Sequence, residues 1–230
     1  MNSLSQYLEL YRLNAEAIDS GSAPALNRLR REAFESLAEA RLPERGEENY
    51  ERTSVNDMFA ADYGLNINRV NIPADVSASF RCDVPNMSTL LGIVVNDEFH
   101  PTPTLSAGLP EGVTFTSLRQ AAIDDPDFVA ARYGSIAPLS MPAVALNTML
   151  VQDGVLIRVR RGVHLEKPLQ LVNIFSAPAS VMAPRRVLVV IEEDASAKLL
   201  VCDHTQDSDR AYLSSEVVEI MLGDNARLDY

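Results

Sequence analysis

The fold class is indicated most clearly by Val187-Leu-Val-Val-Ile-Glu-Glu-Asp-Ala-Ser-Ala-Lys-Leu-Leu-Val-Cys202, in which two short apolar runs flank an acidic turn. Apolar, β-branched runs bounded by polar turn residues are typical of buried strands. Similar short apolar runs occur on both sides of this stretch, at Val155–Val159, Val163–Leu165, Leu169–Val172, Val217–Met221 and Ala226–Leu228. Because helical periodicity is absent after Gln152, residues 151–230 are predicted to form a β domain.

A weak internal repeat accompanies these runs. The segment Glu193–Leu199 resembles Gly223–Leu228, and the equivalent alanines, Ala197 and Ala226, fall within the roughly 20–50 residue spacing of solenoid coils. A β-sandwich or barrel would have similar short strands. Periodicity alone therefore leaves the architecture open.

Residues 1–42 are predicted to form a small helical domain. Ser3-Leu-Ser-Gln6 has the spacing of a capping box, and Leu4, Tyr7, Leu8 and Tyr11 then recur at helical spacing. Gly21-Ser22 breaks this helix. A second helix is expected to begin near Ser22, with Pro24 in its first turn, and to end at Pro43.

Residues 43–150 are predicted to form a mixed connector, because prolines interrupt the segment repeatedly. The expected elements are short strands at Val76–Cys82 and Thr89–Val95, and helical turns at Ser117–Ala122, Asp127–Tyr133 and Met141–Leu150.

Composition excludes several classes of protein. The 230 residues carry a formal net charge of −12 and a pI near 4.7, which disfavours binding to nucleic acid or to an anionic membrane. The sequence contains neither a bilayer-spanning apolar run nor the pattern of a signal peptide. Cys82 and Cys202 are too few for a disulfide framework. We therefore expect a cytoplasmic protein with reduced thiols.

Catalytic motifs are absent from the sequence. Neither Lys167 nor Lys198 lies in a phosphate-binding loop, and no dinucleotide-binding, zinc-protease or nucleophile-elbow pattern occurs. This predicts a protein that is not an enzyme, with no catalytic or cofactor-binding residue to assign.

One possible metal site follows the apolar run that ends at Cys202. Cys202 and His204 lie two positions apart and would project from one face of a strand, with Asp207 and Asp209 following. A pair of ligands supplies only half of the usual four. The favoured interpretation is a core thiol followed by a solvated acidic loop, so no metal ligand is assigned.

Two further clusters of charged residues have more than one interpretation. Arg158, Arg160 and Arg161 could receive an acidic partner, but a solvent-exposed face on an edge strand is favoured. Asp97-Glu-Phe-His100 could serve as an acid–base pair or hold a metal, but no nucleophile or third ligand is nearby. A solvated loop is favoured for this segment.

The segment Ala145-Leu-Asn-Thr-Met-Leu-Val-Gln-Asp-Gly-Val-Leu-Ile-Arg-Val-Arg-Arg-Gly-Val-His-Leu-Glu-Lys-Pro-Leu-Gln-Leu171 closely resembles the iron–sulfur scaffold proteins SufB and SufD. Weaker matches extend the resemblance over about residues 43–230: Pro43 through Thr53, Leu109–Val113, Arg185–Glu193 and Glu219–Leu228. The short, cysteine-poor N-terminal region is more similar to SufD than to SufB.

This resemblance implies a fold and a function. The implied fold is mainly β, a right-handed parallel β-helix behind a small helical domain, with the sequence ending at Tyr230 inside the β-helix. The implied function is that of a SufD-like, non-enzymatic subunit of a SufB–SufC–SufD complex that assembles iron–sulfur clusters and passes them to apoproteins. In that family the ATPase is SufC, and the residues implicated in cluster assembly would lie beyond Tyr230, so this segment is expected to hold no cluster of its own.

Two alternatives stay open beside the resemblance. One is a β-helix enzyme of the polysaccharide-lyase or acyltransferase type. A secreted lyase is expected to carry a signal peptide, and an acyltransferase solenoid is expected to show a strict hexapeptide repeat; neither appears in the sequence. The other is a plain β-solenoid interaction module, which would lack the match at residues 145–171.

Overall fold

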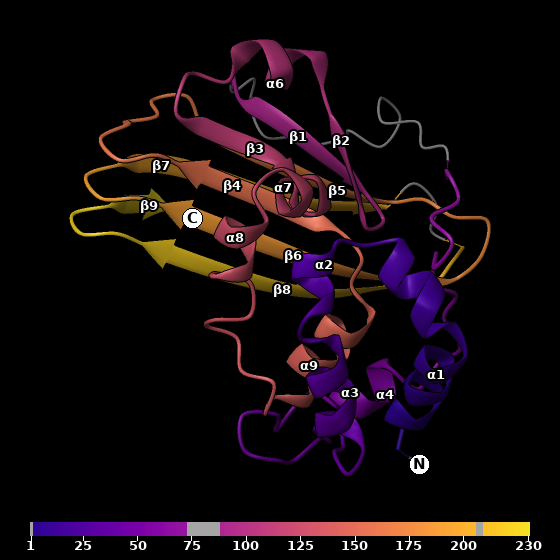
Figure 1. Ribbon diagram of the computed structural model, residues 1–230. Helices are drawn as coiled ribbons and strands as arrows, with labels where there is room; N and C mark the ends of the chain where they lie inside the picture. The colour runs from indigo at the N-terminus through magenta and orange to yellow at the C-terminus, as the bar shows by residue number, and fades with distance from the viewer. Residues whose placement is uncertain (1, 73–87, 206–208) are drawn as a thin grey trace.

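The computed structural model describes residues 2–72, 88–205 and 209–230. The helices precede Gly154 together with three short strands, and the remaining strands follow from Gly154 onward (Figure 1). The helices are α1 (Leu4–Ser20), α2 (Pro24–Asn27), α3 (Arg30–Leu37), α4 (Val55–Met58), α6 (Pro103–Gly108), α7 (Leu118–Asp124), α8 (Pro126–Ala130) and α9 (Pro142–Leu150). The strands are β1 (Leu90–Val95), β2 (Glu98–Pro101), β3 (Val113–Ser117), β4 (Gly154–Val159), β5 (Leu169–Phe175), β6 (Val181–Ile191), β7 (Ser196–Thr205), β8 (Tyr212–Leu222) and β9 (Arg227–Asp229).

The strands form two sheets, and from β4 onward consecutive strands alternate between them. One sheet has the order β3-β4-β6-β8 and the other β2-β1-β5-β7-β9. Pairing is antiparallel for β1 with β2 and for β3 with β4, and parallel for the other pairs. In both sheets, therefore, the backbone hydrogen bonds join strands that are distant in the sequence.

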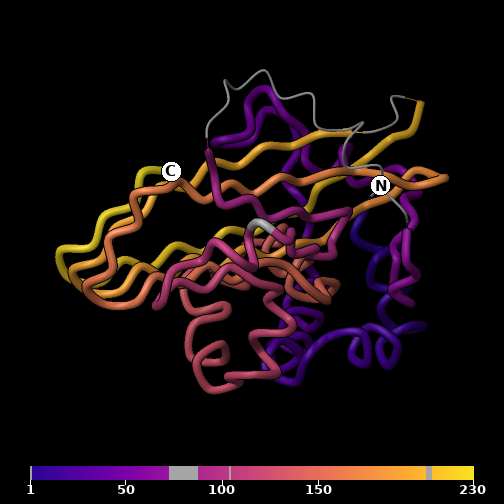
Figure 2. Tube along the Cα trace, turned by 90° about the horizontal axis from the view of Figure 1, so that it is seen from above, coloured from indigo at the N-terminus to yellow at the C-terminus, as the bar shows by residue number. Residues whose placement is uncertain are grey.

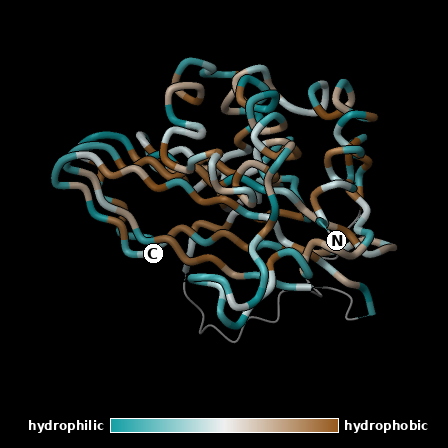
Figure 3. Tube along the Cα trace, turned by 90° about the horizontal axis from the view of Figure 1, so that it is seen from below, coloured by the Kyte–Doolittle hydropathy of each residue, from teal (hydrophilic) through white to brown (hydrophobic). Residues whose placement is uncertain are grey.

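The main core lies between the two sheets, because alternate residues of each strand point to the same face. It combines Val187, Val189 and Ile191 of β6 with Leu169 and Leu171 of β5. Figure 2 shows the long strands running side by side, and in Figure 3 the hydrophobic colour follows the strands while the turns near the C-terminus are hydrophilic.

Helices cover the outer face of the β3-β4-β6-β8 sheet. Residues of α2, α7 and α8 pack there against Leu156, Leu188 and Val190. A second helical group, α1, α3 and α9, shares a core with Met182 and Leu213 at the starts of β6 and β8. Figure 1 shows α1, α3, α4 and α9 gathered on one side of the strands. The layers are thus helices, sheet, core and second sheet.

The predicted fold class was wrong. The sequence and the resemblance implied a mainly β chain organised as a right-handed parallel β-helix, whereas the sheets are mixed and the helices form a full layer. The antiparallel β1–β2 hairpin and the antiparallel β3–β4 pair depart from a purely parallel stack. No closed solenoid is evident in the described parts of the chain, and the arrangement is of the α/β kind.

Several local predictions were confirmed. α1 ends at Ser20, next to the predicted break, and α7, α8 and α9 occupy the three predicted helical turns approximately. The strand predicted at Thr89–Val95 is β1. The strand predicted at Val76–Cys82 lies outside the described residues.

Two local predictions failed because tertiary contacts compete with local ones. Ser3 precedes α1 without a side-chain capping bond; its hydroxyl donates to Asn56 Oδ1 at 2.9 Å instead. Gln6 Nε2 donates to the Phe59 carbonyl at 2.7 Å rather than closing a capping box. The second helix is split into α2 and α3, and α3 ends at Leu37, well before Pro43.

Candidate functional site

Two adjacent arginines of β6 point to opposite faces of their sheet. Arg186 faces the helices, and its Nε lies 3.2 Å from Glu219 Oε2, with both side chains fully buried. Arg185 faces the space between the sheets, on the side of β6 that carries Val187. Each arginine is paired with a glutamate of β8. The parallel register places Arg185 beside Glu216. It also places Glu219 beside Leu188, which lies two residues after Arg186 on the same face of β6.

Arg185 is the centre of a polar cluster at one end of the inter-sheet core. Its Nε lies 3.2 Å from Glu216 Oε2, and its Nη2 lies 3.3 Å from Asp203 Oδ1. Nη2 also donates to the Ser214 hydroxyl at 2.6 Å, and the guanidinium lies 5.3 Å from the centre of the Phe175 ring. Since Glu216 and Asp203 belong to different sheets, this single side chain connects the two sheets.

Asn173 adds an unpartnered amide to this region. The side chain is 1% exposed, and neither its Nδ2 nor its Oδ1 has a hydrogen-bond partner within the parts of the chain that the structure describes. On β5 it alternates with Val172 and Ile174, so it faces the inter-sheet space, and it is the register partner of Asp203. A buried amide without a partner is costly, which marks this position as unusual.

The cluster contains one positively charged side chain, Arg185, and two carboxylates, Asp203 and Glu216. Burial raises the pKa of Glu216; Arg185 opposes this shift and Asp203 reinforces it. Burial also raises the pKa of Tyr230, together with the charges of Glu216 and Asp203. One guanidinium therefore faces two carboxylates. The Asp203 side chain is 63% exposed, so the cluster is open to solvent on that side.

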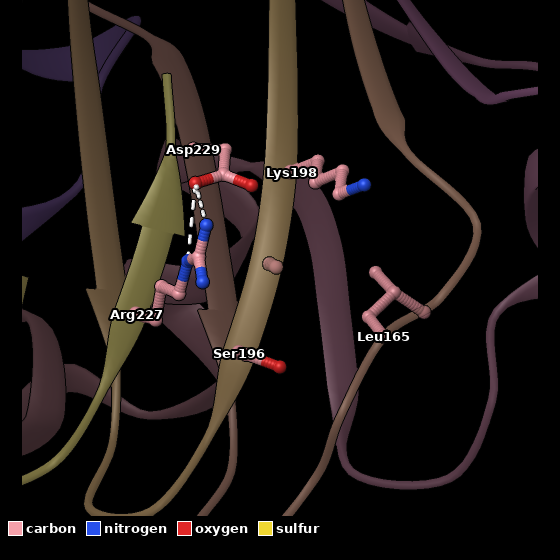
Figure 4. Close-up of a pocket in the computed structure, with 6 residues that line it drawn as sticks. Leu165, Ser196, Lys198, Arg227 and Asp229 are labelled. Carbon is pink, nitrogen blue, oxygen red and sulfur yellow. Dashed lines mark hydrogen bonds and ion pairs between the residues drawn. The ribbon is translucent and has the colours of Figure 1, made fainter.

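A separate pocket of about 250 Å³ lies beside β7 and the edge strand β9 (Figure 4). Arg227 and Asp229 of β9 are joined by an ion pair at 3.2 Å, and the side chains of Ser196 and Lys198 extend from β7 toward the side on which Leu165 lies. The charged residues of the lining, Lys198, Arg227 and Asp229, are exposed, and Arg227 is neutralised by Asp229. This pocket has neither the burial nor the convergent polar groups of the Arg185 cluster.

The predicted Cys202–His204 pair lies on β7, and both residues project from the face opposite to Asp203. Cys202 packs beside the apolar patch of Val172 and Ile174 and accepts a hydrogen bond from Gln170 Nε2 at 3.7 Å. It is half-buried rather than fully in the core. Asp207 lies outside the described residues. Within residues 2–72, 88–205 and 209–230, no three His, Cys, Asp or Glu side chains are grouped so as to hold a metal ion.

The predicted arginine cluster is dispersed. Arg158 lies on β4, which is an inner strand, so the expectation of an exposed edge strand was wrong. Its Nη2 lies 2.6 Å from Glu192 Oε1, and its guanidinium stacks 4.0 Å from the Phe128 ring centre. Arg161 pairs with Glu193 at 2.8 Å, and Arg160 is exposed beyond the end of β4. Two of the three cations are thus partnered within the chain.

The expectation of a solvated loop at Asp97-Glu-Phe-His100 was wrong for Asp97. Its side chain is 9% exposed, and its Oδ2 accepts a hydrogen bond from Arg69 Nη1 at 3.0 Å. Glu98 and His100 belong to strand β2. A residue twenty-eight positions earlier supplies the partner, and nothing local in the sequence indicates such a contact.

Sequence reasoning missed Arg185, Glu216 and Asn173 as a group. The available signal was the presence of charged and amide side chains inside otherwise apolar strands, since such groups are rarely buried without partners. That signal identifies buried polar residues, but not which of them meet.

Comparison with known proteins gives the family. A model described as "SufBD protein N-terminal region" matches residues 1–171. The "Iron-sulfur cluster assembly SufBD family protein slr0076" of Synechocystis sp. (strain ATCC 27184 / PCC 6803 / Kazusa) is 25% identical over 231 residues, covering 96% of this chain and 50% of that protein. The SufBD family protein slr0074 of the same organism is 30% identical over 122 residues, covering 52% of this chain and 25% of that protein. The chain thus spans about half the length of the first relative and matches a quarter of the second.

Proposed function

The chain belongs to the SufBD family, and we propose that it acts in iron–sulfur cluster assembly as a SufD-like, non-enzymatic scaffold subunit. The observation that carries the proposal is the family match over residues 1–171, supported by a curated relative that covers 96% of the chain and whose name states iron–sulfur cluster assembly. The proposed partners are a SufB-like paralogue and a SufC-like ATPase, and the proposed location is the cytoplasm.

One feature of the sequence agrees with a scaffold rather than an enzyme. The sequence has no nucleotide-binding loop, which agrees with ATP hydrolysis being supplied by a partner. No helix in the described parts of the chain is long and apolar enough to cross a membrane. The proposal assigns no resident cofactor to these residues; the cluster would be the cargo of the whole complex, held by thiolates of which this sequence has only Cys82 and Cys202.

The partnership is tested by co-expressing the tagged chain with a SufB-like paralogue and a SufC-like ATPase. We expect the three proteins to co-purify at a fixed stoichiometry and to elute together in size-exclusion chromatography. An unrelated acidic protein of similar size, carrying the same tag, is the control for charge-driven adsorption. If neither partner is retained above that control, the proposed complex is wrong.

The cargo role is tested by anaerobic reconstitution with iron and sulfide, followed by visible absorption spectroscopy. The chain alone is expected to retain no stoichiometric cluster, because about four thiolates normally hold one. The matched control is Cys202→Ser, which should give the same weak spectrum as the unaltered chain. A stoichiometric charge-transfer band that disappears in Cys202→Ser would show that the chain itself holds a cluster.

A further inference from the structure

Three buried ionisable side chains meet beside the turn formed by residues 66–70. Arg69 Nη1 lies 3.0 Å from Asp97 Oδ2, and Arg69 Nη2 lies 3.6 Å from Asp153 Oδ2. The three side chains are 10%, 9% and 4% exposed, respectively. One positive charge thus faces two carboxylates away from water, so the group is charge-balanced only when the carboxylates together bind one proton.

The group joins three separate parts of the fold. Arg69 belongs to a turn in which Asn66 Oδ1 accepts from the Val70 N–H and Asn66 Nδ2 donates to the Val70 carbonyl, both at 2.8 Å. Asp97 lies in the turn between β1 and β2. Asp153 immediately precedes β4. A change in the attraction among these groups therefore changes how strongly the 66–70 turn is held to both sheets.

The 66–70 turn is held in a conformation that needs support. Arg69 has φ +49°, in the left-handed region that side chains other than glycine adopt rarely and at a cost. Next to it, Gln152 Nε2 donates to the Ile67 carbonyl at 2.9 Å and to the Ile18 carbonyl at 3.2 Å, the latter near the end of α1. Arg69 adds to this support through its ion pair with Asp153 and its hydrogen bond to Asp97. That hydrogen bond persists when Asp97 is protonated, because a protonated carboxyl still has an oxygen that accepts.

The two carboxylates are not equivalent. Asp153 Oδ1 accepts hydrogen bonds from the Ser117 hydroxyl at 2.8 Å and from the Arg119 N–H at 2.9 Å. These donors stabilise an ionised Asp153. Asp97 has a less complete set of donors, and Arg69 is its charged partner. The shared proton therefore belongs on Asp97.

We propose that Arg69, Asp97 and Asp153 form a proton-responsive latch, in which one proton on Asp97 tightens the 66–70 turn against the β1–β2 hairpin and the start of β4. The electrostatics agree: burial raises the pKa of Asp97 to about 6, with Arg69 opposing the shift and Asp153 and Glu98 reinforcing it. Burial raises the pKa of Asp153 as well. The latch goes beyond the proposed function and does not depend on it.

Other charged groups near Asp97 are few in the described residues. Glu98 follows it on β2, and Arg185 of β6 donates through Nη1 to the carbonyl of the preceding Asn96 at 3.3 Å. Arg185 is itself committed to Asp203 and Glu216. Across β5, the side chain of Asn96 exchanges neutral hydrogen bonds with the Ser176 backbone. None of these groups supplies Asp97 with the missing positive charge.

The sign of the effect follows from linkage. The folded pKa of Asp97, about 6, lies above the ordinary value of 3.8, so the folded chain takes up this proton more readily than the unfolded chain. Stability from this group is therefore gained as the pH falls through about 6 and is complete below the ordinary value. Above about pH 6 the buried group carries an excess negative charge, and the latch is weaker.

Hydrogen exchange of the Arg69 and Val70 amides tests the latch directly. After correction for the intrinsic pH dependence of exchange, we expect greater protection at about pH 5 than at about pH 7.5 in the unaltered chain. Asp97→Asn, which imitates the protonated carboxyl, should be similarly protected at both values. Glu98→Gln is the matched control and should keep the pH dependence. Equal protection of the unaltered chain at both values would overturn the proposal, as would a pH dependence retained in Asp97→Asn.

Two measurements keep the test decisive. The unfolding constant of the unaltered chain, divided by that of Asp97→Asn, should fall on the order of 100-fold between about pH 7.5 and about pH 4. If the variant does not fold, the carboxyl carbon of Asp97 in the unaltered chain can be titrated by NMR. A midpoint near the ordinary carboxyl value, rather than about 6, would refute the latch.

Discussion

At the scale of single residues, adjacent side chains of β6 meet very different surroundings. Arg185 connects the two sheets, whereas Arg186 is fully buried on the helix side with Glu219. Glu219 also accepts three backbone hydrogen bonds, from Gly134 at 2.9 Å, Ile136 at 3.0 Å and Ala137 at 3.1 Å. This carboxylate therefore neutralises a buried guanidinium and fixes an irregular loop at the same time.

Removing Glu219 should consequently be severe. Glu219→Ala leaves Arg186 buried without its counterion and three N–H groups without their acceptor, so we expect a loss of roughly 3–5 kcal/mol in the free energy of unfolding. Urea denaturation measures this loss. Glu35→Ala is the matched control: Glu35 also pairs with an arginine, Arg31, at 2.9 Å, but on the surface. The control should keep nearly the original midpoint, and a similar loss in both variants would contradict the argument.

At the scale of elements, the pairing of β4 with β6 depends on a glycine. Gly154 begins β4 and is the register partner of Arg186. A methyl group built on Gly154 would lie 1.9 Å from the Arg186 carbonyl oxygen, which is a backbone atom and cannot move aside cheaply. The close approach of β4 to β6 therefore requires a residue without a side chain at this position.

Gly154→Ala should separate the first residues of β4 from β6. We expect a loss of roughly 1–3 kcal/mol in the free energy of unfolding, the usual cost of forcing extra atoms into a packed region. Gly64→Ala is the comparison, because Gly64 bridges to Val181 of the same strand and an added methyl would lie at an ordinary 3.4 Å from its nearest neighbour. Thermal denaturation that finds the two variants equally stable would exclude this steric explanation.

At the scale of the whole molecule, helices and sheets share one of the cores. Met149 of α9 is fully buried in a cluster that also contains Leu4 of α1, Leu37 of α3, Met182 of β6 and Leu213 of β8. Side chains from the N-terminal helices and from the strands thus exclude water from the same space. This arrangement favours unfolding in one cooperative step.

Met149→Ala should test that cooperativity. We expect a loss of roughly 2–5 kcal/mol from the cavity it creates. The urea midpoint should shift equally whether unfolding is followed by circular dichroism or by tyrosine fluorescence. Met141→Ala, at a methionine that is 46% exposed, should shift neither signal appreciably. Two separate transitions in Met149→Ala would show that the helices and the sheets unfold independently.

Local sequence patterns are sufficient to place many of the elements approximately. The apolar runs around Val187–Ile191 and Leu199–Cys202 are parts of strands, because alternation and β-branched residues act locally. The two segments of the internal repeat lie on neighbouring strands, but their register differs from the predicted equivalence by two residues, since Ala197 pairs with Leu228 rather than with Ala226. The resemblance to the SufBD family likewise rests on the order of residues in the segment 145–171, and it depends on no contact between distant segments.

The architecture and the buried charge pairs, in contrast, depend on tertiary contacts. The mixed sheets and their helical layer overturn the expected solenoid, because strand direction and layering are set by contacts between distant segments. Likewise, Arg69 meets Asp97 and Asp153, and Arg185 meets Asp203 and Glu216, across separations that local spacing does not encode. A sequence indicates that a buried charge needs a partner, but folding selects the partner, since the cost of desolvation is offset only by groups that packing brings within reach.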